Sequence, residues 1–396
     1  MHPGGFPANV HQFVRNPGID LLRCLAILLV LLNHIGIRIR LVKTALAGLP
    51  HQALNDLTFN GSEGVYIFFT ISGFLIAGNS IQRWGSLENI DARAFYARRA
   101  ARIMPCLVAL VAVLSILHLA RVPNYVIDRP QQSLHGAVAS ALGLYLNWYE
   151  AHTGYLPANW DVLWSLSIEE VFYLGFPLVC LVLRKDWLLA PALGLLVLSQ
   201  PFALAAIVHD PIWHEKAYLP GMAGIAAGVL TAIVAAHFDP RGRWPRIVLQ
   251  AVGACGVFAI LGFEDNMAHF IGQGVILVLT VSAAALVLGF HWQARAVPTW
   301  SLKGTGWLQS FGRLSYEIYL THMFVVLSVV GVFHVSHASF QWGFLWYLPA
   351  IALAWALGWL VAKYFSFPID YATRQRLMKL KVIVESRPRV KLQPLL

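Results

Sequence analysis

Two ionisable residues interrupt the first apolar run of the chain, and their types and spacing could support acid–base chemistry. Arg23 and His34 lie eleven residues apart in the segment 18–41. In a helix of 3.6 residues per turn, eleven residues are close to three whole turns, so the two side chains share nearly one face, about 16 Å apart. An imidazole exchanges its proton near neutral pH, so His34 is a candidate general base. The alternative pairs Arg23 with Asp20 and leaves His34 as a satisfied interior histidine.

A second candidate cluster lies in the segment WDVLWSLSIEEVFYLGFP, residues 160–177. Ser165 and Glu169 are four residues apart and share a helix face. Acids near a helix N-terminus are common partners of the helix dipole, but here Glu169 and Glu170 enter an apolar run together. If this cluster lies at the depth of His34, Glu169 could orient or charge-balance the imidazole, and Ser165 could supply a hydrogen bond.

Three arginines lie in the segment FYARRAARIMP, residues 95–105, just before an apolar run. Arg98 and Arg102 are four residues apart on one face, with Arg99 beside them. Guanidinium groups bind phosphate oxygens through paired hydrogen bonds, so the segment could hold a phosphorylated ligand. Taken alone, the segment fits better as a cytoplasmic topology anchor.

A later segment, LSYEIYLTHMFVV at residues 314–326, places polar and aromatic side chains at the start of another apolar run. Its members include Ser315, Tyr316, Tyr319 and His322. Aromatic side chains gather at membrane–water interfaces, so interfacial anchoring is the simplest interpretation.

The elements that must position these side chains are predicted to be membrane-spanning helices. Apolar residues make up 58% of the 396 residues and charged residues 12%, about half the charged share of a soluble domain. Only helices and closed barrels satisfy their backbone groups in lipid, and unbroken apolar runs favour helices. The sequence therefore predicts an all-α polytopic membrane protein with about ten transmembrane helices. The predicted spans lie near residues 18–41, 62–82, 103–121, 164–184, 187–208, 217–237, 246–263, 270–291, 310–334 and 343–365.

The positions of basic residues predict the orientation of the protein in the membrane and whether one shorter run, residues 135–149, spans it. Lys and Arg are enriched in cytoplasmic loops, so the arginines of 83–102 lie inside. If 135–149 does not span, or is re-entrant, the later basic loops also fall inside and both termini are cytoplasmic. Arg38, Arg40 and Lys43 then fall outside without a topological reason, and they could serve the site.

The expected organisation is a cytoplasmic segment 1–17, a transmembrane domain 18–367 and a basic cytoplasmic tail 368–396, with no cleavable signal peptide. The formal charge of +10 is explained by cytoplasmic loops, so we expect a lipid-bilayer environment and no nucleic-acid partner. The four cysteines lie in apolar runs without metal-type spacing, so we expect neither a disulfide framework nor a metal site. They are Cys24, Cys106, Cys180 and Cys255.

Together these segments, with one in the second apolar run, resemble the acyltransferase 3 family of membrane O-acyltransferases. The family pattern of arginine, ten residues and histidine is met by Arg23 and His34. The other patterns follow in family order, between residues 18 and 330. They are GVxxFFxxSGFLI at 64–76, RRxxRIxP at 98–105, WSLSxEExFYL at 164–174 and SYxxYLxH at 315–322. The chain departs from the family at Tyr66, where Asp is frequent, and at Val171, where Gln is common.

The resemblance implies transfer of an acyl group, usually acetyl, from cytoplasmic acyl-CoA to a hydroxyl of a cell-surface or exported carbohydrate. The expected location is the bacterial inner membrane, with acetyl-CoA as donor, a glycoconjugate as acceptor and no metal. On this reading His34 is the general base or an acylated nucleophile, supported by Glu169 and Ser165. The donor's phosphates would be bound by Arg23, Arg98, Arg99 and Arg102.

Two alternatives stay open. The same scaffold could acylate a small secreted metabolite such as a macrolide. A transporter or flippase could instead use the buried Arg, His and Glu residues as a proton relay. Transporters often carry internal repeats with broken spans in matching places, and no such repeat is evident in the sequence.

Overall fold

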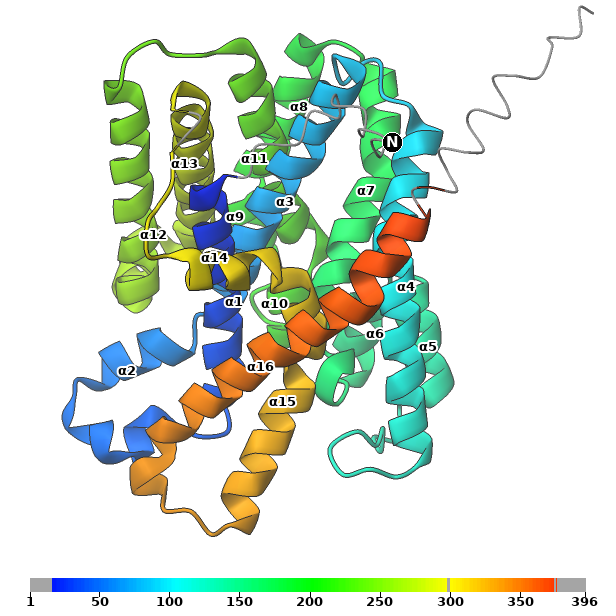
Figure 1. Cartoon of the computed structure of the whole chain (residues 1–396), viewed down its shortest axis with the longest axis vertical. Coiled ribbons are helices and arrows are strands. Elements are labelled where there is room, and N and C mark those ends of the chain that lie inside the picture. Colours follow the sequence, from blue (N-terminus) through cyan, green and yellow to red (C-terminus); the bar gives the residue numbers. More distant parts are fainter. Residues whose placement is uncertain (1–15, 298–299, 374, 376–396) are drawn as a thin grey trace, which may run out of the picture.

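The computed structural model describes residues 16–297, 300–373 and 375, and every regular element in these ranges is a helix (Figure 1). Nine stretches in this part of the chain are long and apolar enough to span a membrane. One of them, Trp244–Ala296, contains two long helices, α12 and α13, joined by a turn at Gly272, which has a φ of 53°. The prediction of an all-α polytopic membrane protein is confirmed; the cytoplasmic placement of both termini stays a prediction.

The first eight α-helices are α1 (Pro17–Gly36), α2 (His51–Thr58), α3 (Gly61–Trp84), α4 (Ala92–Leu119), α5 (Leu134–Leu142), α6 (Leu146–Thr153), α7 (Leu163–Leu183) and α8 (Asp186–Leu198). The others are α9 (Gln200–Ala206), α10 (Pro211–Lys216), α11 (Tyr218–His237), α12 (Trp244–Ile271), α13 (Val275–Ala296), α14 (Gly306–Arg313), α15 (Ser315–Val335) and α16 (Tyr347–Val361). Short 3₁₀ turns include Leu41–Lys43, Ala45–Gly48, η3 (Ala158–Trp160), Gly272–Gly274 and Phe340–Trp346, and a π-helical turn, Ala362–Ser366, follows α16.

The predicted transmembrane domain 18–367 corresponds to the elements from α1 to the turn after α16. The division of the chain at residues 17 and 367 stays a prediction, because residues 1–15 and 376–396 lie outside the described part.

The short run 135–149 does not form a spanning helix. It is divided between α5, with nine residues, and α6, with eight, and Leu144 between them has a φ of 62°. At 1.5 Å per residue each helix is about 12–14 Å long, less than half of the roughly 30 Å hydrocarbon core. The non-spanning assignment inferred from the basic loops is therefore confirmed.

Glycines bring the central helices into direct backbone contact. A Cβ atom on Gly73 of α3 would lie 1.9 Å from the Ile225 carbonyl oxygen of α11, and one on Gly228 would lie 2.0 Å from the Thr70 carbonyl oxygen. Small residues allow this close approach between membrane helices. Gly312 of α14 meets the backbone of α1 in the same way. These contacts fix α1 and α3, which carry candidate site residues, in the middle of the bundle (Figure 1).

Residues 122–163, which contain α5, α6 and η3, are held by a buried ion cluster. The Lys216 ammonium donates to Glu150 Oε2 at 2.7 Å and also to the carboxylate of Asp161. The side chains of Lys216 and Glu150 are completely buried. Asn159, on η3, donates to the carbonyl oxygen of Leu320 at 2.8 Å. The segment is therefore attached to α10 and to α15.

Candidate active site

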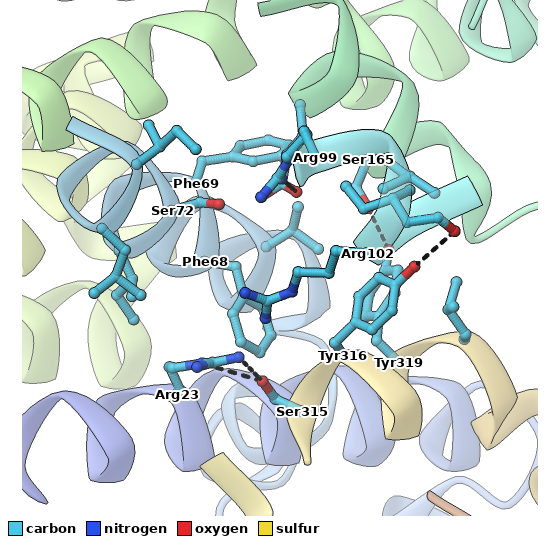
Figure 2. A pocket seen from close by; sticks show the side chains of 18 of the residues that line it. Arg23, Phe68, Phe69, Ser72, Arg99, Arg102, Ser165, Ser315, Tyr316 and Tyr319 are labelled. Carbon is cyan, nitrogen blue, oxygen red and sulfur yellow. Dashed lines mark hydrogen bonds and ion pairs between the residues drawn. The ribbon is translucent and has the colours of Figure 1, made fainter. Parts of the chain in front are cut away.

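A cavity of about 200 Å³ lies between α1, α3, α4, α7 and α15 (Figure 2). Its polar and charged lining residues are Arg23, Ser72, Asn79, Arg99, Arg102, Ser165, Glu169, Ser315, Tyr316 and Tyr319. Apolar side chains such as Phe68, Phe69 and Leu166 complete the wall. Five of the seven site residues predicted from the sequence line this one cavity; Arg98 and His34 do not.

Arg23 is fixed at the cavity wall by the first residue of α15. Its Nε and Nη2 atoms donate to Ser315 Oγ at 3.2 and 2.9 Å (Figure 2). Ser315 is buried, so this contact joins α1 to α15 inside the bundle. The hydroxyl is a neutral partner, and the carboxylates of Asp20, Glu317 and Glu169 lie near enough to interact with the guanidinium charge.

Arg99 is paired with both acids of α7. It donates through Nε to Glu170 Oε1 at 3.2 Å and through Nη2 to Glu169 Oε2 at 3.4 Å. Its guanidinium also lies 3.8 Å from the ring centre of Tyr173. Glu169 thus sits beside Arg99, and no hydrogen bond or ion pair joins it to His34 in the described part of the chain.

Glu169 lies farther from the start of α7 than His34 lies from the end of α1. α7 begins at Leu163, so Glu169 lies six residues, or about 9 Å, into the helix. His34 lies two residues, or about 3 Å, before the end of α1.

Arg102 lines the cavity without a fixed partner. Among the described residues, no hydrogen bond or ion pair holds its side chain, and Figure 2 shows it between Arg99 and Arg23. Arg98 is exposed and does not line the cavity. The three arginines belong to one helix, because α4 begins at Ala92 with Asp91 as its N-cap, and its inner face carries Arg99 and Arg102. Phosphate binding by Arg98 stays a prediction.

Ser165 is hydrogen-bonded to Tyr319. Its hydroxyl donates to the Tyr319 hydroxyl at 2.7 Å, and Tyr319 in turn donates to the Val162 carbonyl oxygen at 2.9 Å. These bonds connect the start of α7 to α15 at the cavity wall, and Figure 2 shows Ser165 and Tyr319 there. A hydrogen bond from Ser165 to His34, which the sequence suggested, is not present.

His34 lies beyond the cavity, against a second histidine. Its ring centre is 5.0 Å from that of His322 on α15, and the His322 ring lies 5.8 Å from the Tyr319 ring. Arg38 donates to the backbone carbonyl of His34 at 2.8 Å. Arg38, one of the basic residues without a topological reason, is therefore part of this site.

His322 and Tyr319 are site residues that sequence reasoning assigned to interfacial anchoring. His322 is completely buried, about 10 Å into α15, because that helix begins at Ser315. The feature of the sequence that could have identified His322 is its residue type, since ionisable residues inside membrane spans tend to serve function.

The described residues contain no group of three or more His, Cys, Asp or Glu side chains that could hold a metal ion. All four cysteines are free thiols; three are buried and Cys255, on α12, is exposed.

Comparison with known proteins agrees with these features. A family model described as an acyltransferase domain matches residues 16–364. The chain is 25% identical to peptidoglycan O-acetyltransferase OatA of Listeria monocytogenes over 350 residues, which cover 82% of this chain and 51% of the relative. It is also 25% identical to the putative peptidoglycan O-acetyltransferase YrhL of Bacillus subtilis over 356 residues, covering 83% and 51%.

A putative O-acetyltransferase of Staphylococcus aureus strain COL matches similarly, at 25% identity over 348 residues, 81% of this chain and 52% of the relative. The chain thus spans about half the length of the curated relatives it matches, and no solved structure matches it. Because the family model covers most of the chain, this multi-pass membrane protein belongs to the acyltransferase 3 family.

Proposed function

We propose that this protein transfers an acyl group, usually acetyl, from acyl-CoA to a hydroxyl of a cell-surface carbohydrate, with His34 as general base. The observation that carries the proposal is the cavity walled by Arg23, Arg99 and Arg102, with a pair of histidines beyond it. The names of the relatives support O-acetylation and a carbohydrate acceptor.

The arginines suit the anionic part of the donor. Arg102 has no fixed partner in the described structure, and the hydrogen bonds of Arg23 at the cavity wall go to a neutral hydroxyl, so both can bind phosphate oxygens. Arg99 is largely neutralised by its two carboxylate partners, so it contributes less attraction. We therefore assign Glu169 to orienting Arg99.

The size of the cavity fits part of the donor. Sites for whole small-molecule ligands usually measure about 300–1,000 Å³. At about 200 Å³, this cavity suits the narrow pantetheine arm, with the nucleotide remaining at its mouth. Tyr319 lines the cavity and its ring lies 5.8 Å from that of His322, so it connects the cavity wall to the histidine pair.

At His34 the chemistry requires one proton transfer and one exchange of bonds. The imidazole takes the proton of the acceptor hydroxyl while the hydroxyl oxygen forms an ester bond to the acyl carbon. The carbon–sulfur bond breaks, and the departing thiolate receives the proton, giving free CoA. A route through an acyl-imidazole at His34 has the same overall balance.

A test uses the purified protein in nanodiscs with acetyl-CoA labelled on the acetyl group. CoA release and transfer of label to a cell-wall glycan extract are followed together, with acceptor-free samples as the control. Label on the glycan supports the proposal. Counterflow of labelled sugar across liposomes, without any consumption of acyl-CoA, would contradict it and support a transporter.

A further inference from the structure

His34 and His322 form a pair whose two members have different environments. They come from α1 and α15, and their ring planes are tilted by 41°. His34 is partly exposed, and its ring makes no hydrogen bond with the described residues. His322 is completely buried behind it. Of the two histidines, His34 is therefore the one nearer to solvent, and His322 is closed off from it.

The hydrogen bond of His322 fixes which of its nitrogens carries the proton. Its Nδ1 lies 2.7 Å from the backbone carbonyl oxygen of Tyr319. A carbonyl oxygen only accepts hydrogen bonds, so Nδ1 is the donor, and Nε2 of the neutral ring holds a lone pair. This Nε2 atom is buried and has no partner in the described part of the chain.

An unsatisfied buried acceptor is uncommon in folded proteins and calls for an explanation. A metal ion does not supply one, since the described residues contain no suitable group of three ligands. The ring of His34 lies against His322 and can offer a donor, because a neutral imidazole has one N–H group. The two rings are in contact but not hydrogen-bonded, and no hydrogen bond of its own restrains the His34 ring.

We propose that His322 is a positioning residue whose Nε2 accepts the N–H of His34 after the unrestrained His34 ring turns toward it. This inference rests on the proposed function. The hydrogen bond fixes the tautomer and the direction of His34, so that its other nitrogen faces the acceptor hydroxyl. The arrangement follows the general rule that a catalytic base is oriented by a third group.

The proton path is balanced. The acceptor hydroxyl gives its proton to the free nitrogen of His34 as the ester bond forms and the thioester bond breaks. The resulting imidazolium is stabilised by its hydrogen bond to His322 Nε2. It then returns one proton to the departing thiolate, and both histidines end in their starting states.

Two substitutions separate this role from a purely structural one. His322→Asn keeps an amide donor near the position of Nδ1, and so the bond to Tyr319, but removes the acceptor at Nε2. His322→Gln extends a carbonyl acceptor to the position of Nε2 and loses the anchoring donor. A positioning role predicts that Gln supports activity better than Asn, and a structural role predicts the opposite order.

The experiment measures kcat and KM for acetyl-CoA in nanodiscs for wild type, both His322 variants, His34→Ala and a control, His334→Asn, at an exposed position of the same helix. We expect His322→Asn to lower kcat about a hundredfold, the scale of a mispositioned base, with KM changed less than about threefold. His322→Gln should stay within about tenfold of wild type, and the control should not change. Equal activity of wild type and His322→Asn, or Asn exceeding Gln, would overturn the inference.

A second readout does not depend on the donor. Solid-state NMR of ring-¹⁵N-histidine protein in lipid reports the tautomers of both rings, with signals assigned from the variants. We expect an unprotonated Nε2 on His322 and a changed tautomer ratio of His34 in His322→Asn. An unchanged His34 signal overturns the inference even if wild type does not consume acetyl-CoA, an outcome that would count against the proposed function alone.

Discussion

Replacing Lys216 with methionine should strongly destabilise the protein. Lys216 is the only cation bonded to Glu150 and Asp161 in the described structure, and Glu150 is completely buried. Methionine keeps much of the volume but leaves the buried carboxylate without its counter-charge. Removing one partner of a buried ion pair typically costs about 3–5 kcal/mol. We expect the loss of unfolding free energy to lie in the lower part of this range, because Asp161 retains some contact with water.

Thermal unfolding followed by tryptophan fluorescence in detergent measures this effect. Lys43→Met, at an exposed position, is the matched control and should change the melting temperature little. The double variant Lys216→Met with Glu150→Leu should recover part of the loss, since it removes a buried charge along with its partner. If Lys216→Met had the same melting temperature as wild type, the assignment of this cluster as the anchor of segment 122–163 would be refuted.

Two further predictions concern the donor cavity and the helix packing. Arg102→Ala should raise KM for acyl-CoA about ten- to a hundredfold, which is the effect of losing one charged hydrogen bond. The control Arg93→Ala, at an exposed position near the start of the same helix, should leave KM unchanged. Equal KM values for the two variants would show that Arg102 does not bind the donor. Gly73→Ala should destabilise the protein by at least about 1–3 kcal/mol in thermal unfolding, because the new Cβ would overlap the Ile225 carbonyl. The control Gly78→Ala should be tolerated, because the space around Gly78 is open. Equal melting temperatures for the two variants would contradict the close contact between α3 and α11.

The helical membrane architecture could be predicted because its causes are local. Apolar runs of about twenty residues define spanning helices, and charge placement showed that 135–149 does not span. Helix ends were less predictable. α4 begins at Ala92, well before the apolar run at 103, because an Asp91 cap and a basic amphipathic first part continue the helix.

The candidate site could be predicted only in part. Residue types and helix faces identified Arg23, Arg102 and Ser165, which line one cavity. The partners of these residues could not be predicted, because they depend on how distant helices pack. Ser165 contacts Tyr319 from α15. The sequence contains no local pattern that would reveal such a contact.

The same reason accounts for the histidine pair. His34 could be singled out because it is an ionisable residue in a membrane span. Its contact with His322 depends on glycine-mediated packing of α1 and on the register of α15, and neither is visible in one sequence. The carboxylate expected beside His34 instead pairs with Arg99, because α4 packs against α7 and brings Arg99 next to Glu169 and Glu170.

The most direct test of the central claim compares acetyl transfer by wild type and His34→Ala in nanodiscs. His51→Ala, at an exposed position on α2, is the matched control. We predict that label moves from acetyl-CoA to glycan in wild type and in the control, and that transfer falls at least about a hundredfold in His34→Ala, as expected for loss of a positioned base. Equal transfer by all three proteins would contradict the account and make His34 a structural residue.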